Sequence, residues 1–163
     1  MFEGIDFNQY EAHIDFAYTT LLMIWGGSLV GIGMLAIPLI FSKVESRTEA
    51  SGLTTQILRR QDFLIRGVVL SMLLVFFLKS KLNYSYQYFE WAVYVVVLHL
   101  YIVGRIVSKR LNKMRDKIGS FDLPAEGDPM RKRFSIVHMG VRYLYIGQVI
   151  GVVVLLYLHA FGL

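Results

Sequence analysis

Three arginines in different apolar segments could together bind an anion. Arg66, Arg105 and Arg142 each lie at the edge of an apolar segment, next to a stretch rich in basic residues. Guanidinium groups pair well with carboxylates and phosphates, so three at one level would form a cationic pocket for an anionic headgroup, carboxylate or phosphate. The other side chains expected in this pocket are Asp62, as the internal partner, Tyr101, Tyr145 and Gln148. The alternative is three arginines that snorkel independently to a membrane surface.

A second polar group is expected at the opposite end of the same segments. Glu90 is 15 residues from Arg105, and His159 is 17 residues from Arg142. Along a helix these offsets are about 22–26 Å, so Glu90 and His159 can share one level. With His13, which precedes the first apolar segment, they form a candidate site for zinc or a similar divalent ion. No ligand pair has a recognised metal-binding spacing, and ordinary interfacial polar residues are the alternative.

No sequence pattern predicts a reaction. The chain has no cysteine, and it lacks both a glycine-rich phosphate loop and a Ser-His-Asp arrangement. His99 and His138 lie about 15 Å apart in height if the arginines are level, which disfavours a bis-histidine haem. The expectation is a protein that is not an enzyme, with a metal ion as an open possibility for a cofactor and haem disfavoured.

The composition places these residues in a lipid bilayer. Of the 163 residues, 55% are hydrophobic and 18% are charged, and the mean hydropathy is +0.51. Soluble domains are less apolar and carry about 25% charged residues. A soluble enzyme, a nucleic-acid-binding module and a disordered tail are therefore excluded.

The expected fold class is all-α: a polytopic membrane protein in which one domain, 1–163, forms a bundle of four transmembrane helices. The predicted spans are 17–41, 63–81, 88–107 and 136–162. The predicted cytoplasmic loops are 42–62, which is expected to form a charged helix, and 108–135, into which the third helix is expected to continue as far as Ile118. The two middle spans reach membrane length only if Arg66, Lys79, Glu90 and Arg105 lie inside the nominal boundary, for example by snorkelling. A re-entrant hairpin is the alternative.

Basic residues alternate between the connections and so predict the orientation. Lys and Arg are absent from 1–15 and from the C-terminus, and few in the second connection. They are abundant after the first span and between 108 and 133. The positive-inside rule then places both termini outside, as expected in a bacterial cytoplasmic membrane. The basic loops would face anionic lipid headgroups, and no nucleic-acid partner is needed to explain the net charge of +5.

Glycines four residues apart occur in the first and last spans. Gly27 and Gly31 form one pair, and Gly147 and Gly151 form the other. Small residues at this spacing let helix backbones approach closely in lipid. The pairs are expected to make contacts within the bundle, and a homo-oligomer or contacts with other membrane subunits are the alternative.

Several short motifs resemble those of a small four-helix membrane family with a domain of unknown function. They are Trp25-Gly26-Gly27, residues 38–41 (PLIF), residues 113–116 (KMRD), and the stretch from Asp128-Pro129 to His138. The family is distantly similar to the CopD copper-resistance and HemJ membrane proteins. Resemblance to CopD implies copper handling, and resemblance to HemJ implies haem-assisted porphyrinogen oxidation. The tryptophan-to-proline spacing here is longer than in HemJ proteins.

Three functions follow as hypotheses. The first is a non-enzymatic membrane protein that binds or helps to move a small ligand or metal ion through polar faces of the third and fourth spans. The second is a scaffold or accessory subunit of a larger membrane complex. The third is a membrane haem or redox enzyme of the HemJ type.

Overall fold

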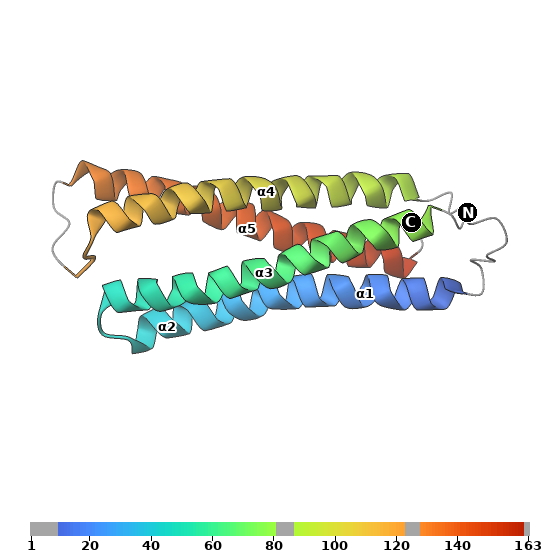
Figure 1. The fold of residues 1–163 in the computed structure, drawn as a ribbon, viewed down its shortest axis with the longest axis horizontal. Coiled ribbons are helices and arrows are strands. Elements are labelled where there is room, and N and C mark those ends of the chain that lie inside the picture. Colours follow the sequence, from blue (N-terminus) through green and yellow to red (C-terminus); the bar gives the residue numbers. More distant parts are fainter. Residues whose placement is uncertain (1–9, 81–86, 123–127, 162–163) are drawn as a thin grey trace.

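The computed structural model describes residues 10–80, 87–122 and 128–161, and these form four long helical segments (Figure 1). The first segment runs continuously through α1 (Glu11–Ser28), the π-helical η2 (Leu29–Ala36) and α2 (Ile37–Lys43). The other three are α3 (Arg47–Lys79), α4 (Gln87–Ile118) and α5 (Pro129–Phe161). We call the end where α1 begins and α5 ends the termini end. The opposite end, where α3 and α5 begin, is the basic end.

All four segments are long and apolar enough to cross a membrane. Three contain 33 residues and the fourth contains 31. At 1.5 Å per residue each is about 46–50 Å long, well beyond a hydrocarbon core of roughly 30 Å. The helices therefore extend past the predicted spans, chiefly at the basic end.

The predicted loops are largely helical. Only residues 44–46 connect α2 to α3, so most of the predicted loop 42–62 is the first half of α3. Likewise, α4 continues to Ile118, as expected, and α5 begins at Pro129, so most of the range 108–135 is helical. Residues 81 and 162, the last of two predicted spans, lie outside the described residues.

Local sequence signals explain where the helices start and stop. Ser46 caps α3, because its hydroxyl accepts a hydrogen bond from the Glu49 amide at 3.1 Å. Asp128 caps α5 in the same way, bonding the Met130 amide at 2.8 Å, and Pro129 suits the first helical turn. Gly119 adopts φ 74°, a left-handed conformation that ends α4.

The first segment changes from α-helix to π-helix in its middle. The Ile37 amide bonds the Ile32 carbonyl, five residues back. Pro38 follows directly, and it has no amide proton to bond the Met34 carbonyl and would crowd it in a regular α-helix. The wider turns relieve this conflict, and π-helical turns are frequent at functional sites.

The core is built from one buried stripe on each helix. On the first segment the stripe is Tyr18, Leu22, Trp25 and Leu29, and on α3 it includes Ile65, Val68, Met72 and Phe76. Tyr94, Val97 and Tyr101 continue it on α4, and Val152 and Leu155 on α5. Large apolar side chains such as Phe16, Phe63 and Leu70 are exposed on the outer surface, as in a lipid-facing bundle.

The two glycine pairs differ in their surroundings. A Cβ on Gly147 would lie 3.1 Å from Leu100 Cδ1, and one on Gly151 would overlap Val97, so this pair lets α5 approach α4 closely. A Cβ on Gly27 or Gly31 would meet no atom within 4 Å. The expected contact of Gly27 and Gly31 within the bundle is therefore absent from the described residues.

Their neighbours Gly26 and Gly33 make the close contacts of this segment. A Cβ on Gly26 would lie 3.0 Å from Val152 Cγ1, and a Cβ on Gly33 would overlap the Tyr145 ring. Both glycines lie on the side of the segment that contacts Val152 and Tyr145. That side packs against α5.

Candidate functional site

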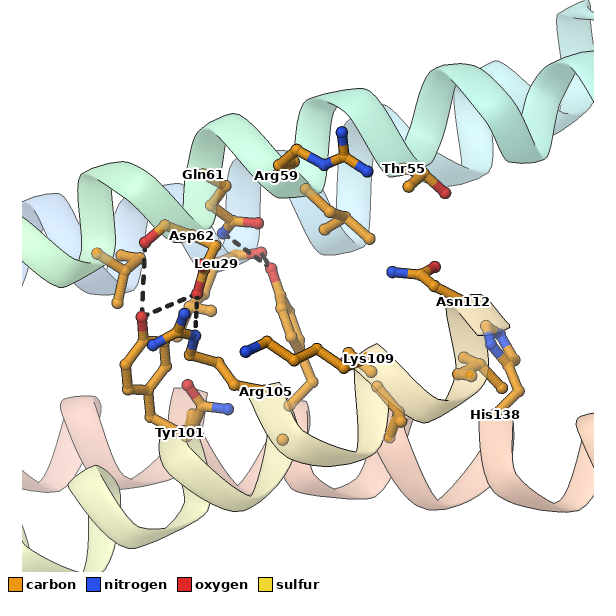
Figure 2. Close-up of a pocket in the computed structure, with 18 residues that line it drawn as sticks. Leu29, Thr55, Arg59, Gln61, Asp62, Tyr101, Arg105, Lys109, Asn112 and His138 are labelled. Carbon is orange, nitrogen blue, oxygen red and sulfur yellow. Dashed lines mark hydrogen bonds and ion pairs between the residues drawn. The ribbon is translucent and has the colours of Figure 1, made fainter. Parts of the chain in front are cut away.

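A cavity of about 470 Å³ opens among the helices in the basic half of the bundle. Figure 2 shows its main walls, with Gln61, Asp62 and Arg59 reaching from α3 and Arg105, Lys109 and Asn112 from α4. The volume is in the range of small-molecule sites. The lining residues are Leu29, Thr55, Leu58, Arg59, Gln61, Asp62, Ile65, Tyr101, Gly104, Arg105, Ser108, Lys109, Leu111, Asn112, His138, Val141, Tyr145 and Gln148.

Asp62 holds α3 to α4 at one edge of the cavity. Its Oδ1 lies 2.9 Å from Arg105 Nε and accepts a hydrogen bond from the Tyr101 hydroxyl at 2.9 Å. Its Oδ2 lies 3.4 Å from Arg66 Nε, one turn along α3. The Asp62 carboxylate therefore fixes the position of the Arg105 guanidinium and leaves that group's other N–H donors for further partners.

A second polar contact ties α3 and α5 to the backbone at the start of η2. Gln61 Nε2 donates to the Ser28 carbonyl at 3.0 Å and lies 3.3 Å from the Tyr145 hydroxyl. That hydroxyl donates to the Leu29 carbonyl at 2.7 Å. These carbonyls lie where α-helix gives way to π-helix, so polar side chains from two other helices bond the backbone there.

The cavity is cationic on one part of its wall and apolar on another. Arg59, Arg105 and Lys109 contribute three positive charges against the single carboxylate of Asp62. Leu29, Leu58, Ile65, Leu111 and Val141 provide apolar surface. Such a cavity suits a molecule with an anionic group and an apolar portion.

Ser120 and Asp122, which follow α4, contact the start of α3 at the basic end. The Asp122 carboxylate accepts hydrogen bonds from the Ser46 hydroxyl at 2.9 Å and from the Arg47 amide at 2.7 Å, at the start of α3. Hydrogen bonding from Thr48 is the main cause that lowers the pKa of Asp122 below its ordinary value, with further help from Ser46 and Arg47. Arg115 also donates to the Thr55 hydroxyl. We call Asp122, Ser46, Arg47, Thr48, Arg115 and Thr55 the basic-end clamp.

The structure brings together most of the residues predicted for the anion pocket. Asp62, Tyr101, Arg105, Tyr145 and Gln148 line the cavity. Arg66 does not line the cavity, but it forms an ion pair with Asp62, which does. Arg142 is exposed on α5 and lines no part of the cavity, so the expected three-arginine arrangement does not form. Arg59 and Lys109 supply the positive charge in its place.

A buried ionic cluster lies near the termini end, and each long helical segment contributes one residue to it. Lys79 Nζ lies 3.4 Å from Asp15 Oδ1, 3.6 Å from Glu90 Oε2 and 3.5 Å from His159 Nδ1. His159 Nδ1 lies 3.9 Å from Glu90 Oε1. We call Asp15, Lys79, Glu90 and His159 the termini-end cluster. Its Lys79 and Glu90 side chains are only 4% and 7% exposed.

The termini-end cluster differs from the metal site expected there. Glu90 and His159 do meet, but His13 is exposed on α1 and is not among the side chains that contact them in the described residues. Within residues 10–80, 87–122 and 128–161, no group of three or more His, Asp or Glu side chains could hold a metal ion. The ammonium group of Lys79 lies among the acidic side chains as their cationic partner.

Two of the residues that sequence reasoning missed had recognisable signals. Lys79 was expected to snorkel, yet it continues the buried series Ile65, Met72, Lys79 at a spacing of seven. Gln61 lies four residues before Ile65 on the same face. Arg59 and Lys109 were assigned to cytoplasmic loops and gave no comparable signal.

Comparisons with known proteins add no relative. No protein-family model, curated protein or solved structure matches this chain. The resemblance to the small four-helix membrane family therefore rests on its short motifs alone.

Proposed function

We propose that this protein is an integral membrane protein that binds a small anionic ligand in the cavity between α3 and α4. The observation that carries the proposal is the cavity wall, in which three cationic side chains face a single carboxylate beside apolar surface. A carboxylate or phosphate group would contact Arg59, Arg105 and Lys109, and an apolar portion would contact Leu58, Leu111 or Val141. Binding, or assisted movement of the ligand, is the proposed activity.

In this proposal the Asp62–Arg105 pair prepares the site before the ligand arrives. Asp62 holds Arg105 through Nε, and the Tyr101 hydroxyl bonds the same carboxylate. A guanidinium held in advance loses less conformational freedom on binding than a free one. The excess positive charge remains for the ligand, because Asp62 balances only one of the three cations.

We further propose that the four helices span a bacterial cytoplasmic membrane, with the basic end in the cytoplasm and both termini outside. The support is the distribution of Lys and Arg along the chain and the apolar outer surface. Because the chain has no cysteine, single cysteines can report topology. In intact cells a membrane-impermeant maleimide should label Tyr10→Cys and spare Lys117→Cys. The reverse pattern would overturn the orientation.

Native mass spectrometry of protein extracted with its surrounding lipid tests the binding proposal. The variant is Arg59→Gln/Lys109→Gln, which removes two cavity cations. The matched control is Arg60→Gln/Lys113→Gln, which removes the same charge from neighbouring positions that do not line the cavity. We expect an anionic molecule to accompany the wild type and the control, and to be lost from the cavity variant. Equal retention by all three proteins would refute the proposal.

Native mass spectrometry also tests a second candidate function, a scaffold that joins other membrane subunits or a second copy of this chain. The observation that favours it is the face of Gly27 and Gly31, which has no neighbour in the described residues. A larger assembly that Gly31→Leu disrupts would support the scaffold. If the wild type and Gly31→Leu are both monomeric, the result would count against the scaffold.

A further inference from the structure

The termini-end cluster lies apart from the anion cavity, and the proposed function does not use it. Between them lie packed aromatic rings, including Phe76 against Tyr94 at 4.7 Å and Trp25 against Tyr101 at 6.2 Å. The cluster is therefore a separate arrangement of charge within the bundle. It needs its own explanation because charged groups within a membrane protein are energetically costly unless they are paired.

The formal charges of the four side chains depend on the protonation of His159. Asp15 and Glu90 contribute two negative charges and Lys79 contributes one positive charge. The Tyr18 ring lies over Lys79 at 4.4 Å and meets the His159 ring edge-on at 4.7 Å. Protonation of His159 on α5 would place a second positive charge within 3.9 Å of the Glu90 carboxylate.

The position of His159 Nδ1 allows two hydrogen-bonded states. It lies 3.5 Å from Lys79 Nζ and 3.9 Å from Glu90 Oε1. Without a proton, Nδ1 accepts a hydrogen bond from the Lys79 ammonium group. With a proton, Nδ1 becomes a donor, so it repels Lys79 and is attracted to the Glu90 carboxylate. A small rotation of the ring exchanges one partner for the other.

The cluster reaches the surface of the bundle at this end. The Asp15 side chain is 34% exposed, whereas Lys79 is 4% exposed, and the two are in contact. Asp15 thus connects the buried Lys79 to the surface of the bundle at the termini end. The interior side of the cluster is closed by Tyr18 and Phe76, which are fully buried.

We propose that Asp15, Lys79, Glu90 and His159 form a binding site for one exchangeable proton, held on His159 and stabilised by Glu90. Uptake forms an N–H bond at Nδ1 with a proton from solvent water. The Lys79–His159 hydrogen bond is lost and a His159–Glu90 bond replaces it. The proposal is independent of the anion cavity.

Nitrogen NMR of the full chain, with ¹⁵N-labelled histidine in lipid nanodiscs, tests this proposal. The chain has four histidines, and His159→Gln identifies the signal of that residue. From about pH 4 to about pH 9, which brackets ordinary histidine titration, His159 should gain one proton at Nδ1. A His159 that keeps one protonation state throughout this range would overturn the proposal.

Two substitutions should move the His159 midpoint in opposite directions. Glu90→Gln removes the anion that stabilises the protonated ring, so the midpoint should fall by about one pH unit or more, a tenfold loss of proton affinity. Lys79→Gln removes the competing cation, so the midpoint should rise. His99→Gln, at an exposed position on α4, should leave it unchanged. If Lys79→Gln does not fold, the near-isosteric Glu90→Gln decides, and an unchanged midpoint overturns the proposal.

Discussion

The Asp62 carboxylate and the Arg105 guanidinium, 2.9 Å apart, join α3 to α4 at the edge of the cavity. Neither helix could present this pair alone. Asp62 also accepts the Tyr101 hydroxyl, so one carboxylate organises two side chains of α4. Because Asp62 and Arg105 are both partly exposed, the pair should contribute a modest amount to stability and a larger amount to the shape of the site.

Arg105→Gln should destabilise the fold and leave Asp62 without its nearest cation. We expect a loss of about 1–2 kcal/mol in the free energy of unfolding, between the contribution of an exposed ion pair and that of a hydrogen bond to a charged group. Thermal unfolding in nanodiscs measures it. The matched control is Arg142→Gln on the exposed face of α5, which should change the midpoint little. Equal effects of the two substitutions would show that the Asp62–Arg105 pair has no special role.

Gly33→Ala should displace the Tyr145 ring and break its hydrogen bond to the Leu29 carbonyl. The added Cβ would overlap the ring, and such overpacking typically costs about 1–3 kcal/mol. Gly27→Ala on the same segment meets no neighbour and should be neutral or stabilising, since alanine favours a helix by about 1 kcal/mol over glycine. Thermal unfolding of both variants provides the comparison. A neutral Gly33→Ala would contradict the described packing of Tyr145.

The basic-end clamp should respond to pH through Asp122. Its pKa is lower in the folded state than in the unfolded chain. Its contribution to the stability of the fold is therefore complete above the ordinary aspartate pKa of about 3.9. It is lost as the pH falls through the lowered value. Asp122→Asn should remove this dependence and speed amide hydrogen exchange at Arg47 and Thr48, whose amides bond the carboxylate.

Asp116→Asn is the control for the clamp. Asp116 is exposed and its described contacts are with its neighbour Arg115. In this variant, amide hydrogen exchange at Arg47 and Thr48 should therefore match the exchange in the wild type at the same pH. Faster exchange in Asp116→Asn, or unchanged exchange in Asp122→Asn, would argue against the clamp.

Lys79 and Glu90 should be energetically coupled. Lys79→Met leaves the buried Glu90 carboxylate without this cation, a change that costs about 3–5 kcal/mol for a buried pair. Glu90→Gln in the same chain should recover part of this loss, with a coupling energy of about 1–3 kcal/mol. A double-mutant cycle of unfolding free energies measures the coupling. Additive effects would show that the 3.6 Å contact contributes little.

Periodicity predicted the buried faces well because each helix repeats its apolar contacts every three or four residues. At 100° per residue Glu90, Tyr94, Tyr101 and Arg105 share one face of α4, and all four contact core or cavity residues. The helical offsets from Arg105 and Arg142 also predicted that Glu90 and His159 share one level, and the two side chains lie 3.9 Å apart. The four membrane-length helices follow from the positions of the apolar segments along the chain.

Predicting which side chains share a site also requires their direction around each helix axis. Arg142 is level with the cavity region, but at 100° per residue it points about 120° away from the buried Gln148. Gly27 and Gly31 have the expected spacing, yet Gly26 and Gly33 face α5. The π-helical turns before Pro38 shift the register of this segment, and a regular 3.6-residue pattern cannot anticipate that shift.

Binding of phenyl phosphate tests the central claim, an anion site between α3 and α4, most directly. This probe has one phosphate and one apolar ring, and calorimetry with protein in nanodiscs measures its affinity. Wild type and Arg60→Gln/Lys113→Gln should bind it saturably at one site with similar affinity. Arg59→Gln/Lys109→Gln should bind it at least about tenfold more weakly, a loss of about 1.4 kcal/mol. Equal affinity in all three proteins, or no saturable binding by the wild type, would contradict the account.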